Sequence, residues 1–205
     1  MLSGLYAITD DSLLPEPRLL EAVEAALSSG CQLLQYRSKI ENWDIRIRQA
    51  KSLQSLCEKY GAKLIINDSV DICTEVDAAG VHLGNNDASL IEARSRLGKG
   101  KLIGFTCHDS IDAAIVAEKA GADYVAFGRF YPSQTKSEAS PASLQIITEA
   151  KNKLSIPIVA IGGINKENGA TLIKAGADML AVVNAIFANE NVAENTLRLI
   201  ELFNN

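Results

Sequence analysis

KAGADYVAF at residues 119–127 and KAGADMLAV at residues 174–182 share one pattern, which is the clearest sign of how this chain folds. In both, a glycine follows a segment with helical spacing, and an apolar run begins within a few residues. Glycine suits such a joint because the residue that closes a helix often takes a positive φ angle, which costs other residues energy. The joint recurs in SSGCQLLQY, KYGAKLIIN and DAAGVHLG (28–36, 59–67 and 77–84). We therefore expect a chain that repeats one helix-and-strand unit.

Short apolar runs with the character of β-strands recur along the whole chain. There are eight: GLYAIT (4–9), LLQYR (33–37), KLIIN (63–67), GVHLG (80–84), LIGFT (102–106), YVAFG (124–128), IPIVAIG (156–162) and MLAVV (179–183). Strands that are apolar on both faces and alternate with helices predict a closed parallel (β/α)8 TIM barrel of minimal size, a single domain over residues 1–205. An open doubly wound sheet is the alternative, but no G-x-G-x-x-G motif follows the first strand.

Composition narrows the classes of protein and partner. The chain has 205 residues with 47% hydrophobic content, which suits one buried core. Its net charge of -5 argues against a general nucleic-acid surface, where basic residues would gather. The N-terminus has no signal-peptide pattern, and no apolar stretch reaches the roughly 18–20 residues of a membrane helix. We therefore expect a cytoplasmic protein with no membrane or nucleic-acid partner, in which a local site holds any anionic ligand.

The cysteines and histidines do not form a recognisable metal or disulfide pattern. Four cysteines at unrelated spacings are predicted to be buried or half-buried free thiols, namely Cys31, Cys57, Cys73 and Cys107. His82 lies in the middle of a strand and is expected to be packed and hydrogen bonded. His108 follows a strand end, where it either touches a ligand or caps the helix that begins near Asp109.

Polar side chains follow nearly every predicted strand. In this barrel the active site lies at the carboxyl ends of the strands. Along Gln35-Tyr36-Arg37-Ser38-Lys39 the alternation of a strand sends Gln35, Arg37 and Lys39 to one side. If that side faces the barrel axis, two cations and an amide converge there, and the inward arginine needs a counter-ion. The alternative is a strand end that frays into a solvated loop.

Asp68 and Asp87 follow the third and fourth predicted strands. Adjacent strands run about 4.8 Å apart, so the two carboxylates could share one ion. Mg²⁺ accepts one or two carboxylates and completes its shell with water and phosphate oxygens. Each aspartate alone could instead cap a helix: Asp68 the segment that starts at Ser69, and Asp87 the segment ASLIEARSRLG.

A phosphate site is expected near the last two strands. GGI (162–164) and VVNA (182–185) stand where such barrels often bind phosphate through glycine N–H groups and a short helix N-terminus. The loop after the sixth strand adds two hydroxyl groups and a cation, from Ser133, Thr135 and Lys136. This loop is either a solvated connection or a closing lid.

Taken together, these stretches resemble the thiamine-phosphate synthase family over nearly the whole chain. The resemblance is carried by LQYRSK (34–39), IIND (65–68), AAGVHLGNND (78–87), IGFTCHD (103–109), ADYVAFGRFYPSQTK (122–136), PIVAIGGI (157–164) and GADMLAVVNAI (176–186). It implies a Mg²⁺-dependent transferase that joins hydroxymethylpyrimidine diphosphate to a thiazole phosphate, giving thiamine phosphate and diphosphate.

The resemblance also implies a role for each matching position. The pyrimidine diphosphate would be held by Gln35, Arg37, Lys39, Asn67, Thr106 and Lys136. Among these, the three cations would stabilise the departing diphosphate. The metal would be held by Asp68 and Asp87. The phosphate of the thiazole would be held by Ser133, Thr135, Gly163, Val183 and Asn184.

Four positions depart mildly from the family pattern. The family usually has Gln at Asn85, Ser at Thr106, Thr at Ser133 and Ser at Asn184, so hydrogen-bonding groups are kept but their reach changes. Two other functions are considered: a thiazole tautomerase on the same barrel, for which His108 would matter more, and a catalytically silent barrel that binds a phosphorylated metabolite or a partner protein.

Overall fold

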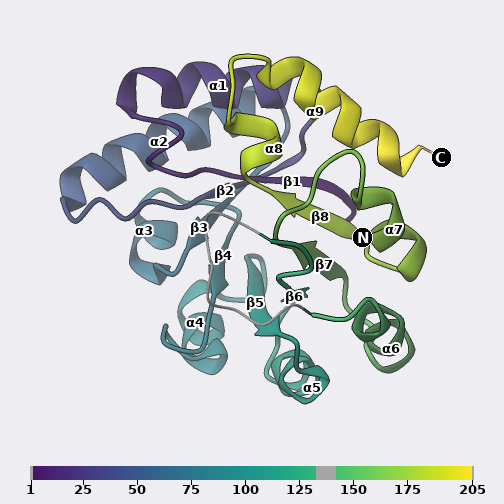
Figure 1. Ribbon diagram of the computed structural model, residues 1–205. Helices are drawn as coiled ribbons and strands as arrows, with labels where there is room; N and C mark the ends of the chain where they lie inside the picture. The colour runs from purple at the N-terminus through teal and green to yellow at the C-terminus, as the bar shows by residue number, and fades with distance from the viewer. Residues whose placement is uncertain (1, 133–141, 205) are drawn as a thin grey trace.

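Eight parallel strands close into one barrel in the computed structural model, which describes residues 2–132 and 142–204 (Figure 1). The strands pair in chain order, and the last pairs with the first. Their bounds are β1 (Gly4–Ile8), β2 (Leu33–Tyr36), β3 (Lys63–Asn67), β4 (Gly80–Leu83), β5 (Leu102–His108), β6 (Tyr124–Phe127), β7 (Ile158–Ile161) and β8 (Met179–Val182). The predicted closed (β/α)8 barrel is confirmed.

Helices surround the strands on the outside (Figure 1). Their bounds are α1 (Glu16–Ser28), α2 (Trp43–Lys59), α3 (Val70–Glu75), α4 (Leu90–Leu97), α5 (Ile111–Lys119), α6 (Gln145–Lys153), α7 (Gly169–Ala175), the short α8 (Asn184–Phe187), α9 (Val192–Ile200) and the 3-10 turn η1 (Glu201–Phe203). Of the helices described, none combines the length and apolar character that a bilayer-spanning segment requires.

Serine side chains begin three of these helices. Ser69, Ser89 and Ser110 accept hydrogen bonds from backbone N–H groups in the first turns of α3, α4 and α5. The possible capping roles of Asp68, Asp87 and His108 are therefore wrong, because each helix begins one or two residues later than those roles require. Both aspartates lie outside the helices that follow them.

Four of the five predicted glycine joints adopt the expected left-handed conformation. The φ angles of Gly30, Gly61, Gly121 and Gly176 are 100°, 66°, 94° and 114°. Gly80 is different, because it is the first residue of β4 and Asp77 takes the positive φ instead. A Cβ atom at Gly80 would lie 2.1 Å from the carbonyl oxygen of Leu102. Glycine is needed there for close strand packing, so the prediction of a helix-closing glycine was wrong at this joint.

The alternation along each strand divides the apolar residues into two cores. Residues that point inward fill the barrel, including Tyr6, Leu33, Ile65, Tyr124 and Met179. Their neighbours that point outward pack against the helices in the larger core, which also buries all four cysteines. Burying an aliphatic or aromatic side chain of this size contributes roughly 1.5–3 kcal/mol. The predicted burial of strands on both faces and of free thiols is confirmed.

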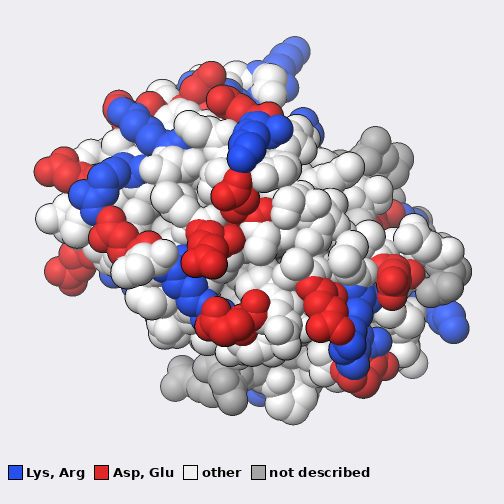
Figure 2. All heavy atoms as spheres, turned by 90° about the horizontal axis from the view of Figure 1, so that it is seen from above, with Lys and Arg blue, Asp and Glu red and all other residues white. Residues whose placement is uncertain are grey.

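Opposite charges alternate on the outer helices. Arg48 and Lys59 of α2 form ion pairs with Glu16 and Glu24 of α1. Figure 2, which shows the molecule from above relative to Figure 1, has basic side chains beside acidic ones rather than gathered in one patch. Such exposed pairs contribute little to stability, typically below about 1 kcal/mol each. This face does not have the charge pattern of a nucleic-acid surface.

Candidate active site

A pocket of about 340 Å³ opens at the carboxyl ends of β1, β2 and β8. It brings together three residues predicted to lie in the site, Arg37, Lys39 and Asn184. The remaining lining comes from the segment after β1: Asp10, Asp11, Ser12 and Leu13. Residues from three strand ends thus converge as the barrel topology predicts.

Arg37 has an internal counter-ion. Its Nη1 lies 3.2 Å from Oδ2 of Asp10, which follows β1. The buried Thr9 holds the two strand ends together, because its Oγ1 accepts from the N–H of Arg37 at 2.9 Å and donates to the carbonyl oxygen of Arg37 at 3.1 Å. Burial raises the pKa of Asp10, but hydrogen bonds from Ser12 and the charge of Arg37 outweigh it and lower the pKa below the ordinary value. Asp10 is thus held as a carboxylate beside the arginine.

Asp11 closes the turn that carries Lys39. Its Oδ2 accepts from the N–H of Lys39 at 2.6 Å and from the hydroxyl of Ser38 at 3.1 Å. Two residues earlier, Tyr36 faces the helices, where its hydroxyl donates to Gln49 of α2 at 2.6 Å. The predicted alternation holds for Gln35 and Tyr36, which face opposite sides of β2. β2 ends at Tyr36, so Arg37 and Lys39 lie in the segment that follows it, where Arg37 is half-buried and Lys39 is exposed.

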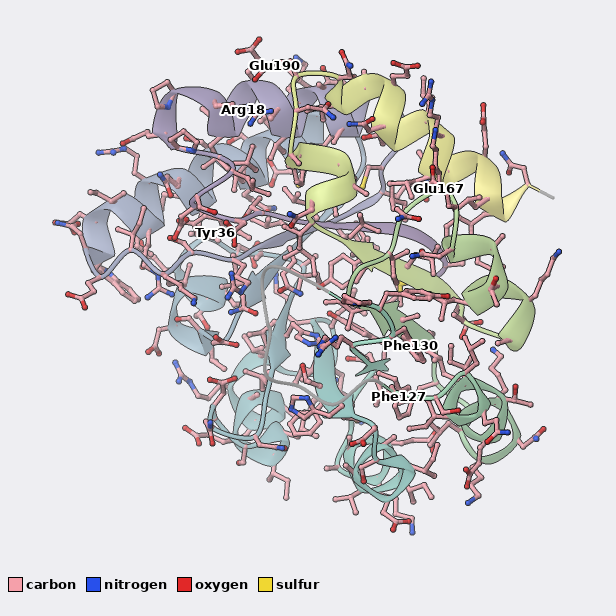
Figure 3. The ribbon with its side chains drawn as sticks, viewed as in Figure 1. Arg18, Tyr36, Phe127, Phe130, Glu167 and Glu190 are labelled. Atoms are coloured by element: carbon pink, nitrogen blue, oxygen red, sulfur yellow. The ribbon has the colours of Figure 1, made fainter. Side chains whose placement is uncertain are left out.

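Arg18 of α1 anchors the segment after β1 from behind. Its Nη1 donates to the carbonyl oxygen of Leu13 at 2.9 Å, and its Nη2 donates to that of Asn189 at 2.5 Å. Glu190 lies 3.5 Å away, and Figure 3 shows Arg18 and Glu190 side by side where α1 meets the loop between α8 and α9. The guanidinium of Arg18 therefore links the pocket lining at Leu13 to the loop between α8 and α9.

Five polar side chains inside the barrel form one hydrogen-bonded series, which we name the interior chain. Gln35 Nε2 donates to the Tyr6 hydroxyl at 2.8 Å, and the hydroxyls of Tyr6 and Tyr124 are 2.9 Å apart. The Tyr124 hydroxyl lies 3.2 Å from His82 Nδ1, and His82 Nε2 lies 2.9 Å from Thr106 Oγ1. The interior chain links two residues of the predicted site, Gln35 and Thr106. The expectation that His82 is packed and hydrogen bonded is confirmed.

The residues predicted to bind the metal and the neighbouring substrate follow or end β3 and β4, and Asp87 lies four residues after the last residue of β4. Asn67 is the last residue of β3 and is half-buried. Asp68 is exposed, has a φ of 64° and donates its N–H to the carbonyl oxygen of His82 at 2.9 Å. Asp87 is half-buried, and its Oδ2 accepts from the N–H of Gly84 at 2.7 Å.

The carboxylates of Asp68 and Asp87 determine which kind of metal ion this side of the mouth could hold. Across residues 2–132 and 142–204, no three acidic, histidine or cysteine side chains gather as a complete ligand cluster. A closed all-protein site, such as zinc favours, is therefore not formed by this part of the chain. Two carboxylates on adjacent strand ends fit an ion that keeps water and substrate oxygens in its shell, as Mg²⁺ does.

Glycines shape the region predicted to bind a phosphate. Gly163, after β7, has a φ of 65°, and a Cβ atom there would lie 2.4 Å from the carbonyl oxygen of Pro132. Asn168 Nδ2 donates to the Gly163 carbonyl oxygen at 3.0 Å. Val183 and Asn184 follow β8 at the start of α8, and β7 pairs with β8. The remaining predicted residues, Ser133, Thr135 and Lys136, lie outside the described residues.

Sequence reasoning missed the residues that support this site. Asp10 and Asp11 follow the first strand directly in AITDD, so the need of an inward arginine for a counter-ion pointed toward them. Tyr6 and Tyr124 gave no such signal, because their rings fit the apolar pattern of a strand and the contact between their hydroxyls spans 118 positions of sequence.

The sequence matches a known family over most of its length. The family model described as thiamine monophosphate synthase matches residues 5–186. The chain belongs to the thiamine monophosphate synthase family. The resemblance seen in the sequence motifs is thereby confirmed.

Individual family members are similar over nearly their whole length. A thiamine-phosphate synthase from Marinobacter nauticus is 51% identical over 187 residues, covering 91% of this chain and 84% of that protein. One from Thioalkalivibrio sulfidiphilus is 48% identical over 202 residues, covering 98% and 96%. Among solved structures, thiamine phosphate pyrophosphorylase from Pyrococcus furiosus has a TM-score of 0.88 at 34% identity, covering 98% of this chain and 95% of that one.

Proposed function

We propose that this protein is a thiamine-phosphate synthase that transfers a hydroxymethylpyrimidine group from its diphosphate to the nitrogen of a thiazole phosphate. The observation that carries the proposal is the pocket that places Arg37 and Lys39 at the mouth, two and four residues after the inward-facing Gln35. Two cations beside one amide suit a substrate that joins a diphosphate to a polar ring. Family membership supports the same reaction.

In the proposed reaction, the bond between the pyrimidine methylene carbon and the diphosphate oxygen breaks first. Both bonding electrons leave with the diphosphate, and the ring amino group delocalises the positive charge left on the carbon. The thiazole nitrogen then forms the new bond with its lone pair. Arg37, Lys39 and Lys136 stabilise the departing diphosphate, and each such contact is commonly worth about 3 kcal/mol of barrier.

This reaction needs no nucleophilic side chain, and the described cysteines are unsuited to supply one. Burial raises the pKa of Cys57 and Cys107 to about 12 and that of Cys73 to about 11. Burial also raises the pKa of Cys31. All four are therefore neutral thiols at physiological pH, whereas nucleophilic catalysis uses the thiolate.

The acidic side of the mouth would hold the metal. Asp68 and Asp87 are the residues we assign to Mg²⁺, which when bound supplies positive charge to the diphosphate oxygens. Asn67, Gln35 and Thr106 would contact the pyrimidine diphosphate. The thiazole phosphate would be held by the backbone at Gly163 and Val183, by Asn184, and by Ser133 and Thr135.

The decisive experiment mixes purified protein with the two phosphorylated precursors and measures thiamine phosphate with Mg²⁺ or with a chelator. We expect product only with Mg²⁺, and we expect the Asp68→Ala, Asp87→Ala double variant to lose at least about a hundredfold in rate. The matched control is an Asp71→Ala, Glu92→Ala variant, which removes two exposed carboxylates from the first turns of α3 and α4.

Three outcomes would contradict parts of the proposal. No product from the wild-type protein would favour a thiazole tautomerase or a silent barrel, which both lack this activity. Product formation unaffected by chelation would remove Mg²⁺ from the proposal. Equal losses in the double variant and its control would show that general charge, rather than the aspartate pair, supports the reaction.

A further inference from the structure

Hydrogen counting gives the interior chain a direction. Tyr6 accepts from Gln35 Nε2, so its single hydroxyl hydrogen goes to its other partner, Tyr124. By the same count Tyr124 donates to His82 Nδ1, which must therefore be unprotonated. In a neutral imidazole the proton is then on Nε2, which donates to Thr106 Oγ1. Once the amide of Gln35 is oriented, the hydroxyl hydrogens of both tyrosines and the proton of His82 have fixed positions.

Both tyrosines keep the hydrogen that this count requires. Burial raises the pKa of Tyr6 and of Tyr124 well above the ordinary tyrosine value, so both are neutral phenols at physiological pH. A phenol has one hydrogen to donate, and it also accepts through its oxygen. Each tyrosine hydroxyl therefore accepts a hydrogen bond from one neighbour and donates one to the next.

Packing holds the rings of the interior chain in place. The Tyr124 ring stacks on His82 with centroids 5.6 Å apart and meets Tyr6 edge-on with centroids 6.0 Å apart. A Cβ atom at Gly104 would lie 2.1 Å from the Tyr124 ring, so this β5 position accommodates the ring only as glycine. In a close-packed interior, a ring held on several sides cannot turn to find another partner.

The two ends of the interior chain show opposite hydrogen-bonding groups. One Nε2 hydrogen of Gln35 goes to Tyr6, while the other Nε2 hydrogen and the carbonyl Oε1 have no hydrogen-bond partner in the described part of the chain. Thr106 accepts from His82, which leaves its hydroxyl hydrogen available among those same residues. The site therefore offers an acceptor on β2 and a donor on β5.

We propose that Tyr6, Tyr124 and His82 are positioning residues that fix this acceptor and donor, so that the site selects an amino-bearing pyrimidine over its oxo counterpart. The inference rests on the proposed function, because it concerns the substrate of the same site. An exocyclic amino group donates to Gln35 Oε1, whereas an oxo group would place one acceptor against another. Thr106 donates to an acceptor on the same substrate.

Gln35 cannot adapt to the oxo ring by turning its amide alone. A turned amide would place Oε1 against Tyr6 and would require every hydrogen in the interior chain to reverse, including the imidazole tautomer of His82. Linked hydrogen bonds reinforce one another, so the reversal has to be collective. A site with fixed, buried polar groups rejects a mismatched analogue far more strongly than an adaptable one.

The first test measures dissociation constants by calorimetry for the 4-amino pyrimidine monophosphate and its 4-oxo counterpart. We expect the wild-type protein to prefer the amino ring by about a hundredfold or more, and Tyr6→Phe or Tyr124→Phe to reduce the preference to about tenfold or less. The ratio within one protein sample does not depend on the fraction that is folded. If one variant fails to fold, the other carries the test.

Tyr36→Phe is the matched control for these variants. It also removes a buried tyrosine hydroxyl bonded to a glutamine, but on the helix side of β2. We expect it to keep the wild-type preference for the amino ring. An equal loss of preference in Tyr36→Phe would overturn the inference, because general destabilisation would then explain the effect.

The second test observes the direction of the interior chain itself. The protein has two histidines, so its ¹⁵N histidine spectrum is readily assigned with a His108→Gln variant. We expect His82 in the single tautomer with the proton on Nε2, and a mixture of tautomers in Tyr124→Phe. A proton on Nδ1 in the wild-type protein would overturn the inference. Wild-type protein that makes no thiamine phosphate contradicts the proposed function, whereas active protein whose tyrosine variants keep the preference contradicts this inference alone.

Discussion

The charged side chains at the two halves of the barrel mouth are held in different ways. We call the half with Arg37 and Lys39 the basic half, although Asp10 and Asp11 also line it, and the half with Asp68 and Asp87 the acidic half. In the basic half, Arg37 has an internal carboxylate partner in Asp10. In the acidic half, Asp87 is held by the N–H of Gly84 and forms no ion pair with a lysine or arginine of the described residues. Arg37 is thus paired within the chain, whereas Asp87 has no cationic partner among the described residues.

This difference separates two ways of preparing a site. A cation oriented by a fixed carboxylate is in place before the substrate arrives, so little reorganisation is needed when charge develops. A carboxylate held by a neutral N–H is oriented but still attracts a cation from solution. Arg37 is therefore oriented by its contacts within the chain, whereas the acidic half is expected to be completed by a cation that it binds.

The largest effect is expected from removing the central cation of the basic half. Arg37→Ala should lower kcat by about 10²–10³-fold, because one preorganised charge contact to the departing diphosphate is lost. The kcat of Arg37→Lys should lie between those of wild-type protein and Arg37→Ala, because lysine keeps the positive charge but not the planar set of donors of arginine. Steady-state product formation measures both.

Arg48→Ala is the control for this loss. Arg48 is an exposed arginine of α2 whose partner is Glu16 on the outer surface. We expect it to keep wild-type activity. Should Arg37→Ala retain more than about a tenth of the wild-type kcat, internal pairing with Asp10 would be a structural feature rather than a catalytic preparation.

A smaller effect is expected from leaving Arg37 in place without its counter-ion. Asp10→Asn keeps the shape of the side chain but removes its charge, and it should lower kcat/KM by about tenfold because the guanidinium loses a charge-assisted hydrogen bond. An Asp44→Asn variant, in the exposed first turn of α2, should retain activity. Equal activities of the two variants would show that Arg37 needs no orienting partner.

The same pair predicts how stability changes in acid. The pKa of Asp10 is lowered in the folded protein, so its contribution to the free energy of unfolding is present above the unfolded-state pKa and is lost as pH falls through the folded value. Below about pH 4, the melting temperature of wild-type protein should therefore fall more steeply than that of Asp10→Asn. Thermal melts across this range measure the difference, and parallel curves would contradict it.

Much of the barrel could be predicted from the sequence because its signals are local. Each strand is apolar on both faces, and at Gly30, Gly61, Gly121 and Gly176 the joint needs a conformation that glycine adopts at low cost. Gly80 looked the same in sequence but serves close strand packing. A glycine that recurs in sequence therefore marks the repeated unit, but it does not show whether glycine is needed for a positive φ angle or for close packing.

The candidate site could be predicted only as far as strand ends determine it. Arg37 and Lys39 line a pocket at the barrel mouth, as expected for residues that follow a parallel strand, whereas their roles remain predictions. The partner of Tyr6 could not be predicted, because contact with Tyr124 depends on the strand register and on the closure of the barrel. The roles of Asp68 and Asp87 remain predictions, for which the proposed Mg²⁺ assay is the test.

The smallest effect is expected from the anchor behind the basic half. Arg18→Ala removes the hydrogen bonds to the carbonyl oxygens of Leu13 and Asn189 and the ion pair with Glu190. Asp10 and Thr9 still hold the strand end. We expect the free energy of unfolding to fall by about 1 kcal/mol, the melting temperature to fall by about 2–4 °C, and KM to rise about twofold.

Arg198→Ala is the matched control for the anchor, because it removes an exposed arginine of α9 whose partner, Glu194, lies one helical turn away. Pairs of that kind contribute about 0.5 kcal/mol or less, so stability and KM should barely change. If Arg18→Ala instead lost as much activity as Asp10→Asn, the loop between α8 and α9 would control the basic half. Its geometry would then be imposed from the outer helices rather than by the carboxylate beside Arg37.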